Sequence, residues 1–180
     1  LLQPYVRYYW VFSSNQMPNT YTFPIGCPQI IFHKRTPLYL PELGTTQSKL
    51  TISGQVNFSS HLQADDNIEM IVVVFHPHTI NMFLDTPASS FYNKEVSGYD
   101  IEDKHLVELA KQVFECEDNN QCVDLIERWL LSRLSIRPYE TTYRVRRMTA
   151  AIEQLCAAPQ TLVTDLSSTC CLCKKQYERE

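Results

Sequence analysis

Hydrophobic and polar residues alternate along the first part of the chain, which is the pattern of β-strands with two different faces. Residues 5–12 read YVRYYWVF, a run of aromatic and β-branched residues that predicts a strand. Four of its side chains would share one face, namely Val6, Tyr8, Trp10 and Phe12. Further strands are predicted at 21–23, 29–33, 50–58 and 68–75, the last apolar enough to be central, whereas the prolines within 36–47 predict a loop.

The spacing of apolar residues becomes helical after residue 98. A first helix is predicted from Leu106, Leu109, Ala110, Val113 and Phe114, with its start near Asp100 or Asp103. A second is predicted from Val123, Ile126, Leu130 and Leu134. Only residues 117–121 separate the two helices, which favours an antiparallel pair, and Pro138 ends this unit.

A third helix and two shorter ones are predicted in the last part of the chain. The third would bury Val145, Met148, Ile152, Leu155 and Cys156 and would end at Pro159. The two short helices are predicted at 163–170 and 173–180, around a tight turn. Strands first and helices afterwards predict an α+β fold, and several short strands without crossover helices indicate a small barrel or sandwich.

Composition and charge narrow the classes of protein that fit this pattern. The chain has 180 residues, of which 44% are hydrophobic and 20% charged, as in an ordinary globular protein. No run approaches the roughly 18 apolar residues of a membrane helix, so no membrane partner is expected. Seven cysteines and no visible secretory signal indicate reduced thiols in a cytoplasmic protein. The net charge is −6 over 1–136 and +2 over 137–180, an asymmetry expected when a sensing domain is joined to a DNA-reading one.

The segment after Pro159 carries the clearest candidate chemistry. Leu166 and Cys170 would be buried on one helix, and Leu172 would anchor the turn that follows. The next helix would present a basic, polar face of the kind that enters the major groove of DNA. The DNA-binding candidates on it are Lys174, Lys175, Gln176 and Arg179. The alternative from pattern alone is an ordinary helical hairpin with a solvated basic face.

This segment resembles the first helix-turn-helix of AraC-type transcriptional regulators. Asp165 and Leu166 match the family pattern, Cys171 and Leu172 fall at its turn, and the basic helix matches its recognition helix. Two residues depart from it: Ser167 replaces an alanine, and Cys173 stands where a serine normally caps the recognition helix, which costs about 1 kcal/mol.

The resemblance extends over nearly the whole chain. The stretches 5–12, 23–33 and 75–77 resemble one sensing-domain subfamily, as does the helix pair with Ile126, Glu127 and Leu130. It implies a cupin-like sensing domain at 1–98, a helix pair packed on it at 99–137, and at 138–180 a connector helix with the start of a DNA-binding domain. It also implies a homodimer that binds a small-molecule effector and DNA. Because the chain stops within the recognition helix, we expect it to bind DNA weakly or not at all.

A cupin-like fold raises the alternative of a small-molecule- or metal-binding protein or enzyme with a helical tail, or of a purely structural dimerisation module. Metal candidates are His33, His61, His76 and His78, and for zinc Cys170, Cys171 and Cys173. Neither set has the spacing of a metal site, so no metal or cofactor is expected. Cys27 is the one cysteine considered as a nucleophile, and without an enzyme motif around it we expect no enzyme.

Two further groups of residues are candidate contacts. Those for an effector in the sensing domain are Tyr8, Trp10, His33 and Phe75. Those for DNA phosphates on the third helix are Arg144, Arg146 and Arg147, which fit a solvated helix face equally well.

Overall fold

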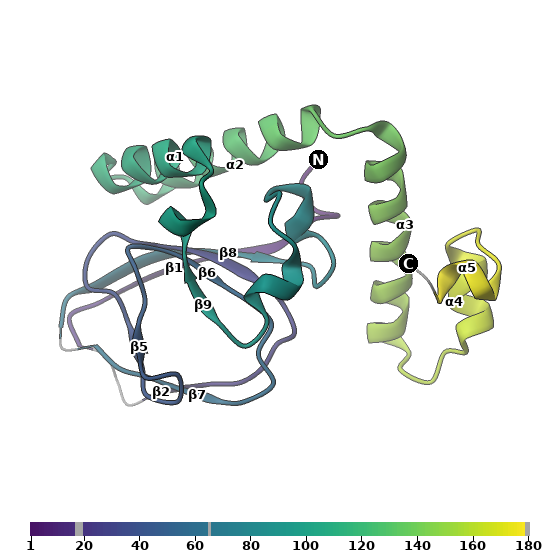
Figure 1. The fold of residues 1–180 in the computed structure, drawn as a ribbon, viewed down its shortest axis with the longest axis horizontal. Coiled ribbons are helices and arrows are strands. Elements are labelled where there is room, and N and C mark those ends of the chain that lie inside the picture. The colour runs from purple at the N-terminus through teal and green to yellow at the C-terminus, as the bar shows by residue number, and fades with distance from the viewer. Residues whose placement is uncertain (17–19, 65, 179–180) are drawn as a thin grey trace. The chain divides into compact units, whose positions relative to one another are not determined.

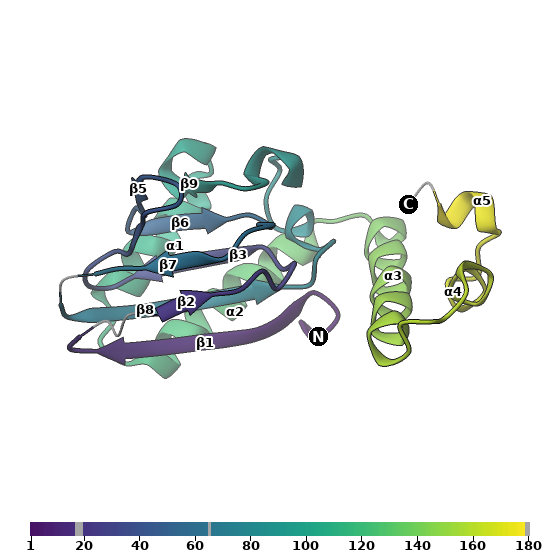
Figure 2. The same cartoon turned by 90° about the horizontal axis from the view of Figure 1, so that it is seen from below.

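The structure, a computed structural model, describes residues 1–16, 20–64 and 66–178 (Figures 1 and 2). The chain divides into two compact units, Leu1–Ser135 and Ile136–Glu180. The first contains the described strands and two α-helices, and the second is helical. Among the described residues, no helix combines the length and apolarity needed to cross a membrane.

Unit 1 is built on a five-stranded antiparallel sheet. In spatial order its strands are β1 (Val6–Ser14), β8 (Ile68–Phe75), β3 (Gln29–His33), β6 (Leu50–Ser53) and β9 (Glu95–Ser97). Two small ribbons accompany it, β2 (Thr20–Thr22) with β7 (Ser60–Leu62) and β4 (Tyr39–Leu40) with β5 (Thr45–Thr46). Since β1 and β9 are its two edges, the sheet formed by the described strands is open and is not a closed barrel.

Strand β8 is buried on both faces because all its side chains except Glu69 are apolar. Its predicted bounds, 68–75, are confirmed, and it lies between β1 and β3 as a central strand. Side chains alternate between the faces of a strand, so Met70, Val72 and Val74 face one side and Ile71, Val73 and Phe75 the other. All six are at most 2% exposed.

One face of the sheet is covered by α1 (Lys104–Glu115) and α2 (Asn119–Ser135), whose prediction as a helix pair is confirmed (Figure 1). Asp103 caps α1, because its carboxylate accepts the backbone N–H groups of His105 and Leu106. The rings of Phe32 and Phe114 meet edge to face at 6.5 Å, which places Phe32 on the helix side of β3.

Two charged side chains connect the helices to the sheet and its loops. The Arg133 guanidinium at the end of α2 donates to the Phe83 carbonyl at 2.9 Å and pairs with Asp85 at 2.9 Å. Lys34, after β3, pairs with Glu69 at 3.0 Å and donates to the Asn119 side chain at the start of α2.

The segment between β8 and α1 contains short elements that the sequence did not predict. They are the 3-10 turns η1 (Ile80–Met82), η2 (Ala88–Phe91) and η3 (Gly98–Ile101) together with strand β9. At Gly54, a Cβ atom would lie 1.8 Å from the Phe91 carbonyl oxygen, so only glycine allows this segment to approach β6 so closely.

Several predictions for the strands are wrong. The strand at 50–58 ends at Ser53, and the loop at 36–47 contains β4 and β5. A bulge between Val6 and Tyr8 pairs Val6 with Phe75 and Tyr8 with Val74. Val6 therefore faces the helices, and does not share a face with Tyr8 as alternation alone predicted.

Unit 2 consists of α3 (Tyr139–Ala157), α4 (Val163–Thr169) and α5 (Lys174–Tyr177). Leu166 and Cys170 are buried against Ala151, as predicted for the α4 side, and Leu172 packs against them from the turn. Cys171 in that turn has a φ of 52°, a left-handed conformation that reverses the chain after α4.

The predicted buried face of α3 is only partly correct. Val145 is buried, but Leu155 is 39% exposed and Cys156 is also exposed. The small side chains Thr149 and Ala151 are buried instead, and Ala151 packs in one cluster with Leu166 and Cys170. Taken together, the mixed α+β class is confirmed, with a five-stranded antiparallel sheet and several helices.

Candidate ligand cavity

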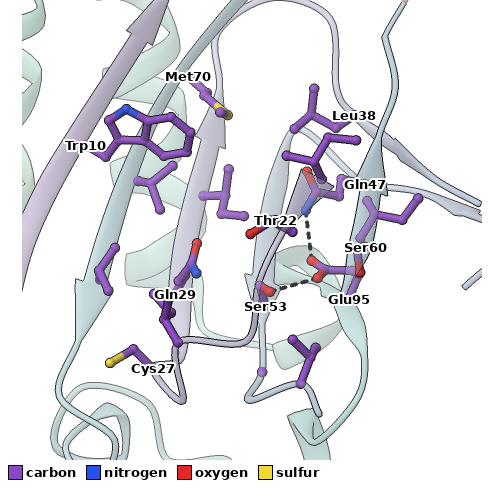
Figure 3. A pocket seen from close by; sticks show the side chains of 18 of the residues that line it. Trp10, Thr22, Cys27, Gln29, Leu38, Gln47, Ser53, Ser60, Met70 and Glu95 are labelled. Atoms are coloured by element: carbon purple, nitrogen blue, oxygen red, sulfur yellow. Dashed lines mark hydrogen bonds between the residues drawn. The ribbon is translucent and has the colours of Figure 1, made fainter. Parts of the chain in front are cut away.

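A cavity of about 180 Å³ lies on the face of the five-stranded sheet opposite the helices (Figure 3). Strands β1, β3 and β8 form its floor, and the β2–β7 ribbon lies on its other side. For comparison, an apolar cavity of about 150 Å³ holds a benzene molecule. The space therefore suits a ligand about the size of a single ring.

Most of the cavity wall is apolar. Met70, Val72 and Val74 of β8 supply its centre, and Ile31 of β3 lies beside them. Tyr8 and Trp10 line the β1 side and are 44% and 43% exposed, so they mark where the cavity meets solvent. Such a wall favours the apolar part of a ligand through burial of its surface.

The polar end of the cavity is centred on Glu95 (Figure 3). The β6–β9 register places Ser53 directly opposite Glu95, and the Ser53 hydroxyl donates to one carboxylate oxygen at 2.7 Å. The Gln47 side-chain amide donates to the other at 2.9 Å. Burial raises the pKa of the Glu95 carboxyl, and these two hydrogen bonds oppose that rise.

His33 orients the Gln47 side chain through a hydrogen bond. The His33 Nε2 and Gln47 Oε1 atoms are 2.8 Å apart, and because the Gln47 nitrogen already donates to Glu95, its oxygen must accept from His33. His33 is fully buried, and burial lowers its pKa to about 4, so the ring is neutral near pH 7. Three neutral donors therefore surround one carboxylate: Ser53 and Gln47 donate to Glu95 directly, and His33 donates to Gln47.

The effector candidates from the sequence fall into two groups. Tyr8 and Trp10 line the cavity. His33 does not line it and reaches it only through Gln47. Phe75 lies on the helix face, where its ring contacts Phe83 at 5.1 Å, because alternation along β8 turns it away from the cavity.

Glu95, Gln47 and Ser53 were missed from the sequence. They lie in short or irregular stretches, and their contacts span 42 residues in one case and 48 in the other. Only the pairing of β6 with β9 brings them together.

The candidate metal ligands do not converge. Within the described ranges, no three His, Cys, Asp or Glu side chains are close enough to hold a metal ion together. Cys170 is buried in the core of unit 2, whereas Cys171 and Cys173 are exposed. Cys27 is buried and lines the cavity.

The DNA-binding candidates lie on and after α5. Lys174, Lys175 and Gln176 are exposed, and Arg179 lies outside the described residues. The Gln176 side chain accepts the backbone N–H of Cys173 at 3.2 Å, which helps to cap this short helix. On α3, Arg144 and Arg146 are exposed, and Arg147 lies over the Tyr143 ring at 4.9 Å.

Comparison with known families finds a match for the β-rich part of the chain. A family model described as a domain of unknown function (DUF6597) matches residues 1–97. The chain belongs to the DUF6597 family. The matched residues include every described strand and the whole cavity, so the cavity is a feature of the DUF6597 domain of this chain. No curated protein and no solved structure matches the chain with significance.

Proposed function

We propose that the chain is part of a transcriptional regulator of the AraC type, in which the DUF6597 domain binds a small effector and unit 2 contributes to DNA reading. The observation that carries the proposal is the cavity, which combines apolar walls with a few convergent polar groups, as small-molecule sites do. In this proposal the sheet and its ribbons are a cupin-like sensing fold, open at one side. The regulator would act in the cytoplasm as a homodimer.

Unit 2 supports the DNA-reading part of the proposal. Helices α4 and α5 are joined by the tight left-handed turn at Cys171, and Leu166 and Cys170 fix their packing. Lys174 and Lys175 are exposed, and their one ion pair with another described residue is the long contact from Lys174 to Glu178 at 3.9 Å, so phosphate binding would cost them little.

The effector proposal is tested by filling the cavity. Val72→Phe would place a ring inside it, whereas Val11→Phe puts the same ring on an exposed position of β1. A set of neutral, cationic and anionic single-ring compounds is screened, and we expect those that bind the cavity to raise the melting temperature of the wild type and of V11F, but not of V72F. Stabilisation of V72F by the same compounds to the same extent would show that they bind elsewhere.

The DNA proposal is tested through salt dependence. The association constant for DNA falls as the salt concentration rises. Replacing both Lys174 and Lys175 with alanine should make the slope of its logarithm against log salt less steep by about 2, if each lysine binds one phosphate. The matched control replaces Lys104 and Lys111, which are exposed on α1, and should leave the slope unchanged. Equal slopes for both double variants would remove α5 from the DNA contact.

A second function, a small-molecule-binding protein or enzyme, is favoured by the Glu95 carboxylate in the cavity, since such groups serve in acid–base catalysis. The two functions differ in the fate of the ligand. A regulator releases its effector unchanged, whereas an enzyme converts it, so mass spectrometry of a stabilising compound after incubation with the chain separates them.

A further inference from the structure

Within the part of the chain that the structure describes, Glu95 is an acid without a basic partner, and its two oxygens accept only from the neutral donors Ser53 and Gln47. Among the described residues, no lysine or arginine pairs with it, and none lines the cavity. Burying a carboxylate without a positive counter-charge costs free energy, and the described residues supply no such counter-charge.

The surroundings of Glu95 indicate which charge a ligand at this end of the cavity should carry. A carboxylate has acceptor sites for about four hydrogen bonds, and Ser53 and Gln47 use two of them. His33 cannot supply the missing charge, because its Nε2–H is directed to Gln47 and the ring is neutral. What remains at this end of the cavity is acceptor capacity, with negative charge in the ionised form of Glu95, which a ligand with N–H groups and a positive charge would match.

The other end of the cavity fixes the rest of the ligand. Trp10 and Met70 lie across the cavity from Glu95 (Figure 3), and both offer apolar or aromatic surface. The volume of about 180 Å³ admits one ring or a short branched chain and little more.

We propose that the cavity binds a small protonated amine, with its nitrogen paired to the Glu95 carboxylate and its apolar body against Trp10 and Met70. This inference rests on the proposed function, because it assumes that the cavity holds a ligand.

Three probes of nearly equal size test the proposal by calorimetry on the full chain: benzylamine, benzyl alcohol and benzoate. We expect benzylamine to bind tightest and benzoate not to bind, since its carboxylate would face Glu95. In Glu95→Gln the affinity for benzylamine should fall by about 30-fold or more, the loss expected when one partner of a buried charge pair is removed. Benzyl alcohol should bind wild type and E95Q alike, which also shows that the variant keeps its cavity.

Glu108→Gln is the matched control, because Glu108 is exposed on α1 and its substitution makes the same change of charge. It should bind benzylamine as the wild type does. Equal binding of benzyl alcohol and benzylamine, or unchanged benzylamine binding by E95Q, would overturn the amine proposal and leave the ligand cavity in place. Absence of binding by all three probes would overturn the proposed effector site as well.

Discussion

The two faces of the five-stranded sheet are equally buried but differently filled. On β8, every apolar side chain is at most 2% exposed, on the helix face and on the cavity face alike. The helix-facing Phe75 nevertheless meets a neighbouring ring, whereas Val72 borders empty space. Burial and packing are therefore separate properties. Folding requires that one face be closely packed, and the other keeps a space that stability alone would fill.

The largest expected effect comes from emptying the packed face. Phe75→Ala should lower the free energy of unfolding by about 3–5 kcal/mol, because Phe75 is fully buried and contacts Phe83. Trp10→Ala is the comparison on the cavity face, where the side chain is 43% exposed and much less packing is lost. Urea denaturation of both variants measures the difference, and equal losses would contradict it.

The next effect is a dependence of stability on pH that belongs to the cavity face. The pKa of His33 is lowered to about 4, so between about pH 6.5 and 4 the unfolded chain binds more protons than the folded one. Stability should therefore fall as the pH falls through this range, by about 3 kcal/mol in full. The raised pKa of Glu95 acts in the opposite direction, since its folded carboxyl takes up a proton first.

The contributions of His33 and Glu95 to the pH dependence are separated by comparing the wild type with a variant that lacks the His33 ring. His33→Gln keeps a donor for Gln47 but has no titrating ring. Urea denaturation of wild type and H33Q at a series of pH values should show the wild type losing more stability than the variant on acidification. Parallel curves would mean that His33 is not the titrating group.

The smallest effect compares two neighbouring valines of β8. Val73→Ala on the helix face should cost about 1 kcal/mol more than Val72→Ala on the cavity face, because methyl groups beside a cavity have fewer packing partners to lose. Both residues are 1% exposed, so burial alone predicts equal losses. Thermal denaturation of the pair decides between packing and burial as the controlling quantity.

The sequence predicted those parts of the fold that have a long, regular pattern. The run 68–75 is apolar except for Glu69 and is bounded by the turn at Asn67 and by Pro77, which indicates a central strand without knowledge of its neighbours. The helices α1 and α2 repeat apolar residues over several turns and were predicted for the same reason.

Short elements and the polar end of the cavity could not be predicted in this way. Strands β7 and β9 have three residues each, too few for a period to be read. The bulge at the start of β1 reverses the face of Val6, and local alternation contains no sign of it. Tyr8 and Trp10 could be proposed because aromatic residues mark apolar surfaces, whereas Glu95 became a candidate only through its register with Ser53.

The chain contains two tryptophans, and they lie on opposite sides of this sheet. Trp10 is 43% exposed at the cavity, and Trp129, on α2, is 9% exposed. Fluorescence therefore gives each face an intrinsic reporter: a ligand in the cavity should change the emission of Trp10, whereas loosening of the helix layer should shift that of Trp129 to the red. A Trp10→Phe variant leaves only the Trp129 signal, so titrations of wild type and variant side by side separate occupancy of one face from integrity of the other.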